Sequence, residues 1–337
     1  MQSQARTGFD IASAVWLGKR ETQEDALAID APLGSDIGLV VLADGMGGHA
    51  AGDVASTIVV TEVFADLKLR SAGFAESPET LTDTLRNAAD AANRCVAAHV
   101  AANPGTEGMG ATLVALVAQG NALHWISVGD SPLFLWRDGK LTQLNEDHSL
   151  APQIDYMVES GQMDAEVGAT HPDRNCLTSV LMGREVDRTD CPDTAFALRP
   201  DDIIVVASDG LQFLSNDAIS ALLAELGPMS SADIASVLLE AVQALADPHQ
   251  DNVSFAVLQS RAGAVRRAHA PRRRLGRRKA ARGKAGQEAK GLLATMAESP
   301  GTAADAPAAM KSTTRWSGLT ALTRRLRSGD NTREALE

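Results

Sequence analysis

The chain has 337 residues, 45% of them hydrophobic, which is enough to bury the core of one large domain. Its net charge of −12 is unevenly distributed, because residues 261–337 carry 18 Lys and Arg against 6 Asp and Glu, whereas residues 1–260 carry 13 against 37. An acidic body argues against nucleic-acid binding. We therefore expect one large domain over residues 1–260, no nucleic-acid partner, and a separate basic tail.

The cysteines favour a protein of a reducing compartment, and the apolar segments favour a soluble protein. Cys95, Cys176 and Cys191 show no metal-ligand spacing, and one would stay unpaired if the other two were bridged. No apolar run approaches the roughly 18 residues that span a membrane, and the N-terminus lacks a signal-peptide core. We expect a soluble, cytoplasmic protein with a monomeric body.

Hydrophobic periodicity predicts strands and then two helices in the first third of the chain. Apolar residues mark strands at 11–18 and 26–29, and the continuous apolar run 39–43 has the length of a buried strand. Helical spacing then gives one apolar face, formed by Ala55, Val59, Val60, Val63, Phe64 and Leu67. A second, Ala-rich helix is expected from about 80 to 102, where Asn-Pro-Gly ends it.

The pattern changes to strands after residue 108. Three strands are expected within 108–141, with hairpin turns at Gly120-Asn121 and Asp138-Gly139. The irregular insert at about 150–176 predicts a small mobile subdomain with one or two short helices. The remaining expected elements are strands at 177–182, 194–198, 203–207 and 253–258 and amphipathic helices at 216–226 and 231–246.

Four aspartates lie at the boundaries of apolar runs. Asp44 ends the run 39–43 and begins a glycine-rich turn, Asp130 and Asp209 follow later runs, and Asp251 precedes the last one. Considered alone, each has a structural alternative, such as capping a helix or a bend. The spacing of the glycines fits neither a nucleotide P-loop nor a Rossmann loop.

The four carboxylates together predict a site for divalent cations. They supply hard oxygen ligands without sulphur or an obvious imidazole cluster, which suits Mg²⁺ or Mn²⁺. Two such ions bridged by one carboxylate can lower the pKa of a shared water and align it with a phosphorus atom. The segment 20–25 adds Arg20, whose guanidinium can grip a phosphate, and Glu24 and Asp25, whose carboxylates can orient water. A solvated hairpin is the alternative for that segment.

The order of the motifs resembles the metal-dependent protein phosphatase family, also called type 2C, in its bacterial form. The resemblance covers about residues 8–259, and the matching pieces are, in order, RETQEDA, VLADGMGGHAAGDVAS, GMGATLVAL, VGDS, LTQLNEDHS, LTSVLMG, VVASDGL and DNVSFAVL. It implies an α+β fold, a four-layer αββα sandwich in which two antiparallel sheets are flanked by helix pairs, with metals at one end. The insert at about 150–176 corresponds to the family's flap.

The resemblance also implies the metal ligands, residue by residue. Asp44 would bridge two Mn²⁺ or Mg²⁺ ions, with the carbonyl of Gly45 on the first ion and with Asp209 and Asp251 on the second. Asp130 and Asp209 would hold a third, weaker ion. All of these residues are present, which argues against a catalytically inactive relative.

Other residues would act on the phosphate and on the leaving group. Arg20 would bind the substrate phosphate, and Glu24 and Asp25 would hydrogen-bond metal-bound waters, the nucleophile among them. Met46 occupies the position at which animal members carry a histidine thought to protonate the leaving group. His49 is therefore the candidate general acid, with a structural role in the turn, or a metal-bound water as the acid, as the alternatives.

Two residues depart from the family pattern. Gln23 stands where the family usually has Asn, which is a mild change. Pro132 stands where an arginine is more common, so that local packing or phosphate affinity would differ.

We therefore expect a serine/threonine protein phosphatase of signal transduction, which hydrolyses phosphoserine and phosphothreonine in proteins, among them a Ser/Thr kinase or its substrates. A non-catalytic phosphoprotein-binding regulatory module of the same fold is the alternative from another class. A phosphatase specialised for one anti-sigma-type regulator is a further alternative.

The tail, residues 261–337, is rich in Arg, Ala and Gly and has little to bury, so its composition predicts disorder. Within it, residues 314–328 combine Trp and Leu with Arg at the spacing of a short amphipathic helix. This segment is a candidate for contact with a membrane surface or a partner, and the tail as a whole is a candidate for docking on the acidic body. A plain soluble linker is the alternative.

Overall fold

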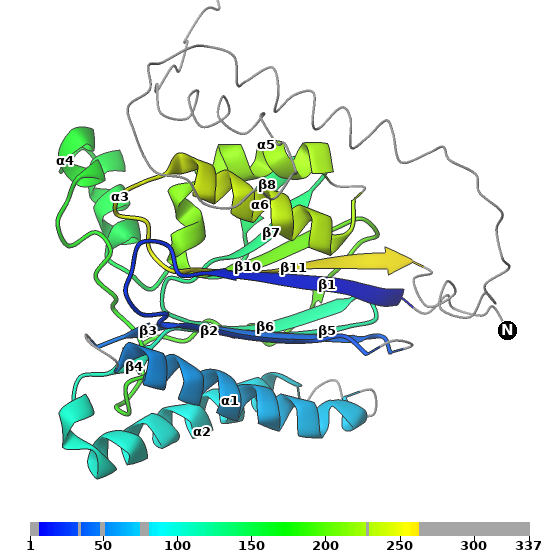
Figure 1. Ribbon diagram of the computed structural model, residues 1–337, viewed down its shortest axis with the longest axis horizontal. Coiled ribbons are helices and arrows are strands. Elements are labelled where there is room, and N and C mark those ends of the chain that lie inside the picture. Colours follow the sequence, from blue (N-terminus) through cyan, green and yellow to red (C-terminus); the bar gives the residue numbers. More distant parts are fainter. Residues whose placement is uncertain (1–6, 33–34, 48–50, 75–80, 227–228, 263–337) are drawn as a thin grey trace, which may run out of the picture.

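The computed structural model describes residues 7–32, 35–47, 51–74, 81–226 and 229–262. They form four layers, in which two facing sheets are each covered by a pair of helices (Figure 1). Helices α1 (Gly52–Arg70) and α2 (Leu81–Ala102) cover one sheet, and α5 (Asn216–Leu226) and α6 (Ser231–Leu245) cover the other. The expected α+β sandwich of αββα layers is therefore confirmed.

Both sheets are antiparallel throughout their described pairings. Sheet A has the order β1-β11-β10-β7-β8, with β1 (Thr7–Trp16), β11 (Val253–Ala262), β10 (Ile203–Ala207), β7 (Leu133–Arg137) and β8 (Lys140–Gln143). Sheet B has the order β2-β3-β5-β6-β9, with β2 (Asp25–Asp30), β3 (Ile37–Met46), β5 (Leu113–Gln119), β6 (Ala122–Val128) and β9 (Phe196–Ala197). The short strand β4 (Gly110–Ala111) pairs with the end of β3.

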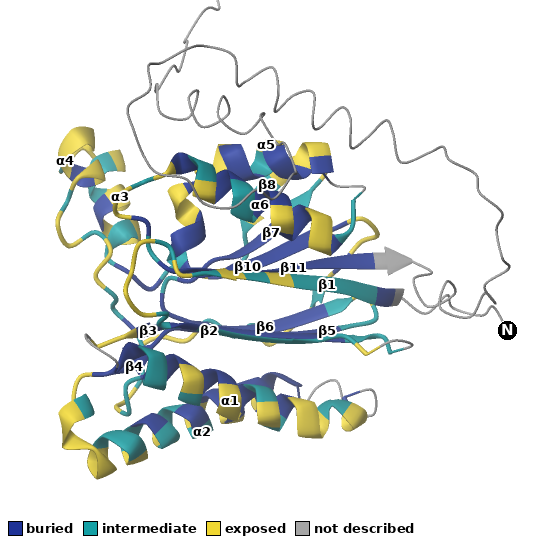
Figure 2. Ribbon diagram, in the orientation of Figure 1, coloured by how far each residue is buried: buried dark blue, intermediate teal, exposed yellow. Residues whose placement is uncertain are grey.

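Strand β3 shows why its sequence reads as an unbroken apolar run. Successive side chains of a strand point to opposite faces. Leu39 and Val41 pack against α1 and α2, whereas Val40 and Leu42 pack between the two sheets. Both faces are therefore buried, and polar residues are excluded from the strand until its end (Figure 2).

The helices bury the faces that their spacing predicts. On α1, the residues Val59, Val63 and Leu67 are fully buried against sheet B, and Phe64 is half-buried at the edge of the same cluster. On α6, Ile234 and Leu238 are fully buried against sheet A. The outer faces of these helices are exposed (Figure 2).

The expected hairpins are confirmed. Gly120 has a φ of 60° between β5 and β6, and Asp138 and Gly139 have φ angles of 53° and 79° between β7 and β8. In the second hairpin, positive φ at both central residues matches the right-handed twist of the flanking strands. The predicted third strand is therefore two paired strands.

Two other strand predictions are wrong or too long. Residues 177–182 form no strand but only isolated bridges, Ser149 with Leu177 and Ala111 with Leu181. The predicted strand 194–198 is reduced to the two residues of β9. The first segment meets its neighbours at single residues and the second pairs with β6 over only two, so apolar composition alone did not produce a full strand in either.

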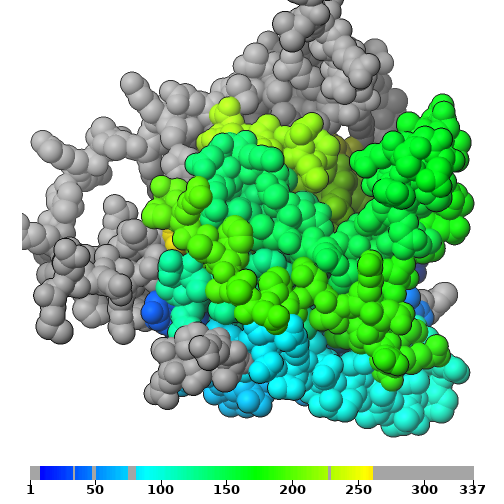
Figure 3. Space-filling model, turned by 180° about the vertical axis from the view of Figure 1, so that it is seen from behind, coloured from blue at the N-terminus to red at the C-terminus, as the bar shows by residue number. Residues whose placement is uncertain are grey.

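The insert between β8 and β10 contains two short helices, α3 (Ala151–Glu159) and α4 (Ala165–Ala169), as expected for the flap. Arg174 donates two hydrogen bonds to Asp155, of 2.7 and 2.9 Å, and these bonds tie the last residues of the insert to α3. The flap projects from one end of the sandwich (Figures 1 and 3). The described 3-10 turns are η1 (Ser71–Gly73), η3 (Pro104–Thr106) and η4 (Asp209–Phe213).

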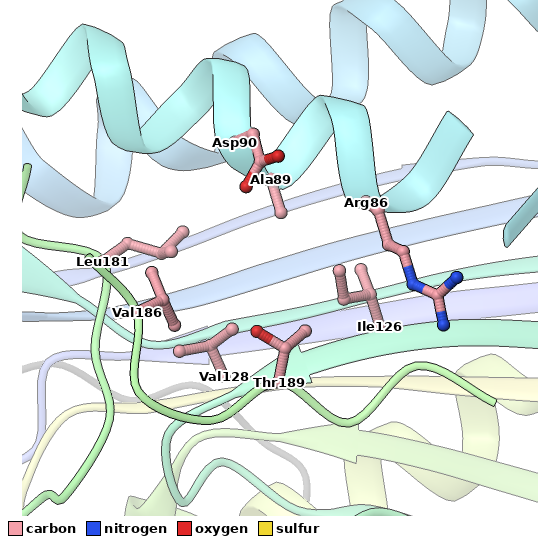
Figure 4. Close-up of a pocket in the computed structure, with 8 residues that line it drawn as sticks. All are labelled: Arg86, Ala89, Asp90, Ile126, Val128, Leu181, Val186 and Thr189. Carbon is pink, nitrogen blue, oxygen red and sulfur yellow. The ribbon is translucent and has the colours of Figure 1, made fainter. Parts of the chain in front are cut away.

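A cavity of about 210 Å³ lies between α2 and sheet B (Figure 4). Ala89, Ile126 and Val186 line its apolar part, and Arg86 and Asp90 lie on the α2 side. Among the described helices, none combines the length and the apolar character needed to cross a bilayer.

Candidate active site

Five aspartates from distant parts of the chain meet at one end of the sandwich. Asp25 and Asp44 are direct partners in the β2–β3 ladder. Asp209 follows β10 and Asp251 precedes β11, which are neighbouring strands of sheet A. Asp130 follows β6 of sheet B. The expected meeting of the strand-end aspartates is therefore observed, with Asp25 as a further member.

The negative charges of these aspartates repel one another. Burial raises the pKa of Asp44 well above its usual range, and the charges of Asp25, Asp209, Asp130 and Asp251 raise it further. Burial followed by the charge of Asp251 likewise raises the pKa of Asp209, although the Asp44 and Asp209 carboxyls are within hydrogen-bonding reach of each other. Carboxyls in such an arrangement cannot all ionise without added positive charge.

The pKa values of two further aspartates of the cluster are also raised. Burial raises the pKa of Asp25 to about 7, against the opposing effect of hydrogen bonds from Ser208 and Ser254. Burial, with the charges of Asp209 and Asp147, raises the pKa of Asp130 to about 7. Perturbed carboxyls grouped in this way mark a functional site more often than a structural one.

The donor set suits hard divalent cations. The side chains supply carboxylate oxygens, which are the ligands of Mg²⁺ and Mn²⁺. Oδ1 of Asp25 is buried and has no hydrogen-bond partner among the described residues, so the cluster contains an unsatisfied acceptor. Among the residues that the structure describes, no three His, Cys, Asp or Glu side chains are grouped tightly enough to hold a metal ion.

Arg20 lies at the rim of the cluster. Its side chain is 56% exposed, and its guanidinium forms an ion pair with Asp251. The preceding backbone is anchored because Lys19 N–H donates to the carbonyl of Gln250 at 2.9 Å. A guanidinium held beside the carboxylates with its outer face open is suited to binding a phosphate.

Glu24 is held at the entrance of α1. Its backbone N–H donates to Oδ1 of Asn252 at 2.8 Å, and its carbonyl accepts from Gly45 N–H at 3.0 Å. A Cβ added to Gly45 would lie 2.0 Å from the carbonyl oxygen of Gly52. Only glycine allows this approach of β3 to the start of α1, which places the backbone of Gly45 in the site.

Sequence reasoning missed several polar residues that fix the ligand-bearing segments. Asn252 is buried, and its Nδ2 donates to the carbonyls of Leu17 and Thr22 at 2.9 and 3.0 Å. Together with the bond from Glu24 N–H, this side chain joins the start of β11 to the segment that carries Arg20. The signal was its place directly after Asp251, where a polar residue begins an otherwise apolar strand.

Thr112 and Ser208 serve two other carboxylates. Thr112 N–H donates to the carbonyl of Asp44 at 2.8 Å, while its Oγ1 accepts from Asp44 N–H at 2.9 Å and shares a hydrogen bond with Ser131. Oγ of Ser208 donates to Oδ2 of Asp25 at 2.8 Å. No local pattern revealed these contacts, because each joins residues far apart in the chain.

The flap borders the acidic cluster. A cavity of about 430 Å³ lies between them, lined by Asp130, Asp147, Ser149, Ala151, Arg174, Asn175, Asp209, Gln212 and Phe213. The cavity therefore joins two of the predicted metal ligands to residues of the flap, as expected for a loop beside an active site.

The two departures from the family pattern are accommodated locally. Beside Pro132, the side chain of Asn145 accepts from Leu133 N–H at 2.8 Å and donates to the carbonyl of Ser131 at 3.0 Å, which secures the turn. Gln23 donates to Ser254 at 3.3 Å. Met46 is 37% exposed at the end of β3. His49, the candidate general acid, lies outside the described residues.

A four-layer sandwich with carboxylates and an arginine gathered at one end defines a protein of the metal-dependent phosphatase class. The family model described as protein phosphatase 2C matches residues 17–247. The chain therefore belongs to the protein phosphatase 2C family.

Named relatives agree with this assignment. The serine/threonine protein phosphatase PstP of Mycobacterium tuberculosis is 38% identical over 173 residues, which are 51% of this chain and 31% of that protein. The putative 2C-type protein phosphatase of Streptococcus pyogenes is 35% identical over 191 residues, 56% of this chain and 73% of that protein. The chain thus spans about a third of the first curated relative that it matches.

Solved structures show the same fold. The crystal structure of the M. tuberculosis phosphatase PstP/Ppp has a TM-score of 0.63 at 33% identity, and the match covers 75% of this chain and 99% of that one. The PstP catalytic domain in complex with two manganese ions has a TM-score of 0.62 at 32% identity, over 76% and 99% of the two chains.

Proposed function

We propose that the protein is a metal-dependent serine/threonine protein phosphatase, which hydrolyses phosphoserine and phosphothreonine in other proteins. The observation that carries the proposal is the meeting of Asp25, Asp44, Asp130, Asp209 and Asp251 beside the open guanidinium of Arg20. Relatives named as serine/threonine phosphatases support the substrate class.

The oxygen donors of these residues suit two Mn²⁺ or Mg²⁺ ions. Asp44 would bridge them, with the carbonyl of Gly45 on one and with Asp209 and Asp251 on the other. Asp130 and Asp209 would hold a third ion. Bound divalent cations supply positive charge that favours ionised water and stabilises phosphoryl oxygens. The manganese ions in a PstP structure support this assignment.

The side chains divide the remaining work. Arg20 can donate two parallel hydrogen bonds to the phosphoryl oxygens and orient the phosphorus towards the carboxylates. Because Oδ2 of Asp25 accepts from Ser208, its Oδ1 is left to accept a hydrogen bond from the attacking water. Glu24, anchored through its backbone to Asn252, can hold a second water in place.

The metal-dependent mechanism is tested with p-nitrophenyl phosphate and a phosphothreonine peptide. Activity should require Mn²⁺ or Mg²⁺, disappear in EDTA, and fall by about 10²-fold or more in Asp209→Asn. Asp138→Asn is a matched control, because Asp138 lies in an exposed hairpin turn and Asn tolerates its positive φ. Activity that survives EDTA or Asp209→Asn would contradict the mechanism, and phosphopeptide binding without turnover would favour the non-catalytic binding module.

His49 remains the proposed general acid. Protonation matters most for a poor leaving group, so His49→Ala should slow hydrolysis of the phosphothreonine peptide and leave p-nitrophenyl phosphate nearly unchanged. Equal effects on both substrates would assign the acid elsewhere.

The biological setting is also a proposal. We infer that the monomeric body acts in signal transduction in the cytoplasm, on a Ser/Thr kinase or its substrates. The three free cysteines support a reducing compartment. Profiling phosphoproteins would show instead whether one anti-sigma-type regulator is preferred.

Strand β11 continues through residues 261 and 262, which pair with the start of β1, so the expected boundary after residue 260 lies two residues too early. The basic tail is proposed as a separate segment from residue 263 onward, and residues 263–337, including 314–328, lie outside the described residues. Its charge supports docking to an anionic surface. Co-sedimentation with anionic liposomes, with and without residues 263–337, tests membrane contact, and equal binding would leave the linker or the acidic body as the alternatives.

A further inference from the structure

His148 occupies the junction between the acidic cluster and the flap. Its side chain is fully buried, although it belongs to a polar segment that sequence reasoning assigned no function. Two hydrogen bonds connect it to the turn that precedes Asp130. His148 N–H donates to the carbonyl of Gly129 at 3.0 Å, and Gly129 N–H donates back to Nδ1 of His148 at 3.2 Å.

The carbonyl of His148 is fixed to the other end of the flap. Thr178 donates to it twice, from its backbone N–H at 2.7 Å and from Oγ1 at 2.8 Å. Two residues further into the flap, Leu150 N–H donates to the carbonyl of Cys176 at 3.0 Å. The flap therefore leaves and rejoins the body beside His148.

The turn at Gly129 is held from its other side by Thr112. Gly129 has a φ of 103°, and a Cβ there would lie 2.6 Å from Cγ2 of Thr112. Thr112 in turn exchanges two hydrogen bonds with Asp44. The turn before Asp130 is thus confined between Thr112, which holds Asp44, and His148, which holds the ends of the flap.

The hydrogen bonds of His148 determine which ring nitrogen carries the proton. Because Nδ1 accepts from Gly129, the neutral ring carries its hydrogen on Nε2. Burial lowers the pKa of His148, which favours this neutral form. Nε2 has no hydrogen-bond partner among the described residues, and its nearest acid, Glu146, lies 3.8 Å away. A buried unpaired donor is costly, so filling space does not explain a histidine here.

We propose that His148 is a positioning residue that couples the flap to Asp130 through the Gly129 turn. The proposal rests on the proposed function for the part that concerns Asp130 as a ligand. Loss of the Nδ1 acceptor would free Gly129 N–H and loosen the turn that positions the Asp130 carboxylate. The bonds of Thr178 to the His148 carbonyl would remain, but the backbone of His148 that they hold would be less firmly fixed to the body.

Two variants of His148 separate positioning from packing. His148→Asn keeps an acceptor near the place of Nδ1, whereas His148→Phe keeps a flat ring and removes the acceptor. Hydrogen exchange is measured in EDTA for the amide of Gly129, for the flap, and for β10 as a core reference. Loss of one hydrogen bond predicts about tenfold faster exchange of Gly129 and of the flap, residues 150–176, in His148→Phe, with β10 unchanged, and recovery in His148→Asn.

A second readout concerns the loaded enzyme. The Mn²⁺ concentration for half-maximal activation should rise about tenfold in His148→Phe and return towards wild type in His148→Asn. Unchanged Gly129 exchange, equal acceleration in β10, or an Asn variant no better than Phe would overturn the proposal. If His148→Phe does not fold, Thr178→Val takes its place. Hydrogen exchange of the flap should be faster in Thr178→Val, with exchange of β10 unchanged. Unchanged flap exchange would overturn the proposal. Exchange in EDTA does not depend on turnover, so inactivity of the wild type would contradict the proposed function alone.

Discussion

Arg20 combines an ion pair to Asp251 with a side chain that is 56% exposed, and this exposure leaves its guanidinium open to the proposed substrate phosphate. Arg20→Ala should raise the KM for a phosphothreonine peptide by about 10- to 100-fold with a smaller change in kcat, because charge-assisted hydrogen bonds to phosphate are lost. Steady-state kinetics at saturating Mn²⁺ measures both constants.

Arg86→Ala is the control for Arg20, because Arg86 is exposed and pairs with Asp193 on the α2 side. It should leave both constants close to wild type. A KM that does not change in Arg20→Ala would exclude phosphate binding by Arg20.

Two glycines with similar backbone angles offer a test of how the site is built. Gly18 has a φ of 67°, and a Cβ there would lie 2.1 Å from the carbonyl oxygen of Asp251, whereas Gly120 has a φ of 60° and open space around it. Gly120→Ala should cost roughly 1 kcal/mol of stability, the usual penalty for a left-handed residue, and keep activity. Gly18→Ala should cost more and lose most activity, because Asp251 must move.

Urea denaturation and Mn²⁺-dependent hydrolysis measure the two glycine variants side by side. Equal losses of stability with full activity in both would show that the contact of Gly18 with Asp251 is not needed.

At the scale of elements, α2 does not fill its contact with sheet B. Ala89 faces the 210 Å³ cavity (Figure 4). Ala92, on the same helix, is fully buried and is not among the residues that line the cavity. Ala89→Leu should raise the free energy of unfolding by about 1 kcal/mol, because added methyl groups enter existing space. Ala92→Leu should lower it by about 1–3 kcal/mol through overpacking.

Thermal and urea unfolding compare the two alanine variants, which make the same chemical change. Destabilisation of both to the same extent would mean that the helix cannot use the cavity.

At the scale of the whole molecule, the acidic cluster links stability to pH. The pKa of Asp25 and that of Asp130 are raised from 3.8 to about 7, so the folded chain binds protons more tightly than the unfolded chain between these values. In EDTA, the free energy of unfolding should therefore fall as pH rises from about 4 to about 7. Mn²⁺ should reverse the loss near pH 7, because it binds the ionised carboxylates of the folded state.

Urea titrations across this pH range measure the effect. Asp25→Asn should flatten the slope, and the exposed Asp193→Asn should keep it. A metal-free protein whose stability rises from pH 4 to 7 would contradict the raised pKa values.

The sequence by itself determined most of the elements and the carboxylates that meet at one end of the sandwich. The run 39–43 and the buried face of α1 follow from local spacing, because burial on one or two faces imposes a period on the chain. Asp44, Asp130, Asp209 and Asp251 could be identified because each marks the boundary of such a run.

Only the tertiary structure decided which strands pair and what holds the aspartates. β6 and β7 are consecutive, yet they belong to different sheets, and β1 pairs with β11 from the other end of the described chain. Asn252, Thr112 and His148 act through partners far away in sequence. A local pattern records that a residue is buried, but the identity of its neighbour depends on how distant segments pack, and that packing brings the carboxylates to one end of the sandwich.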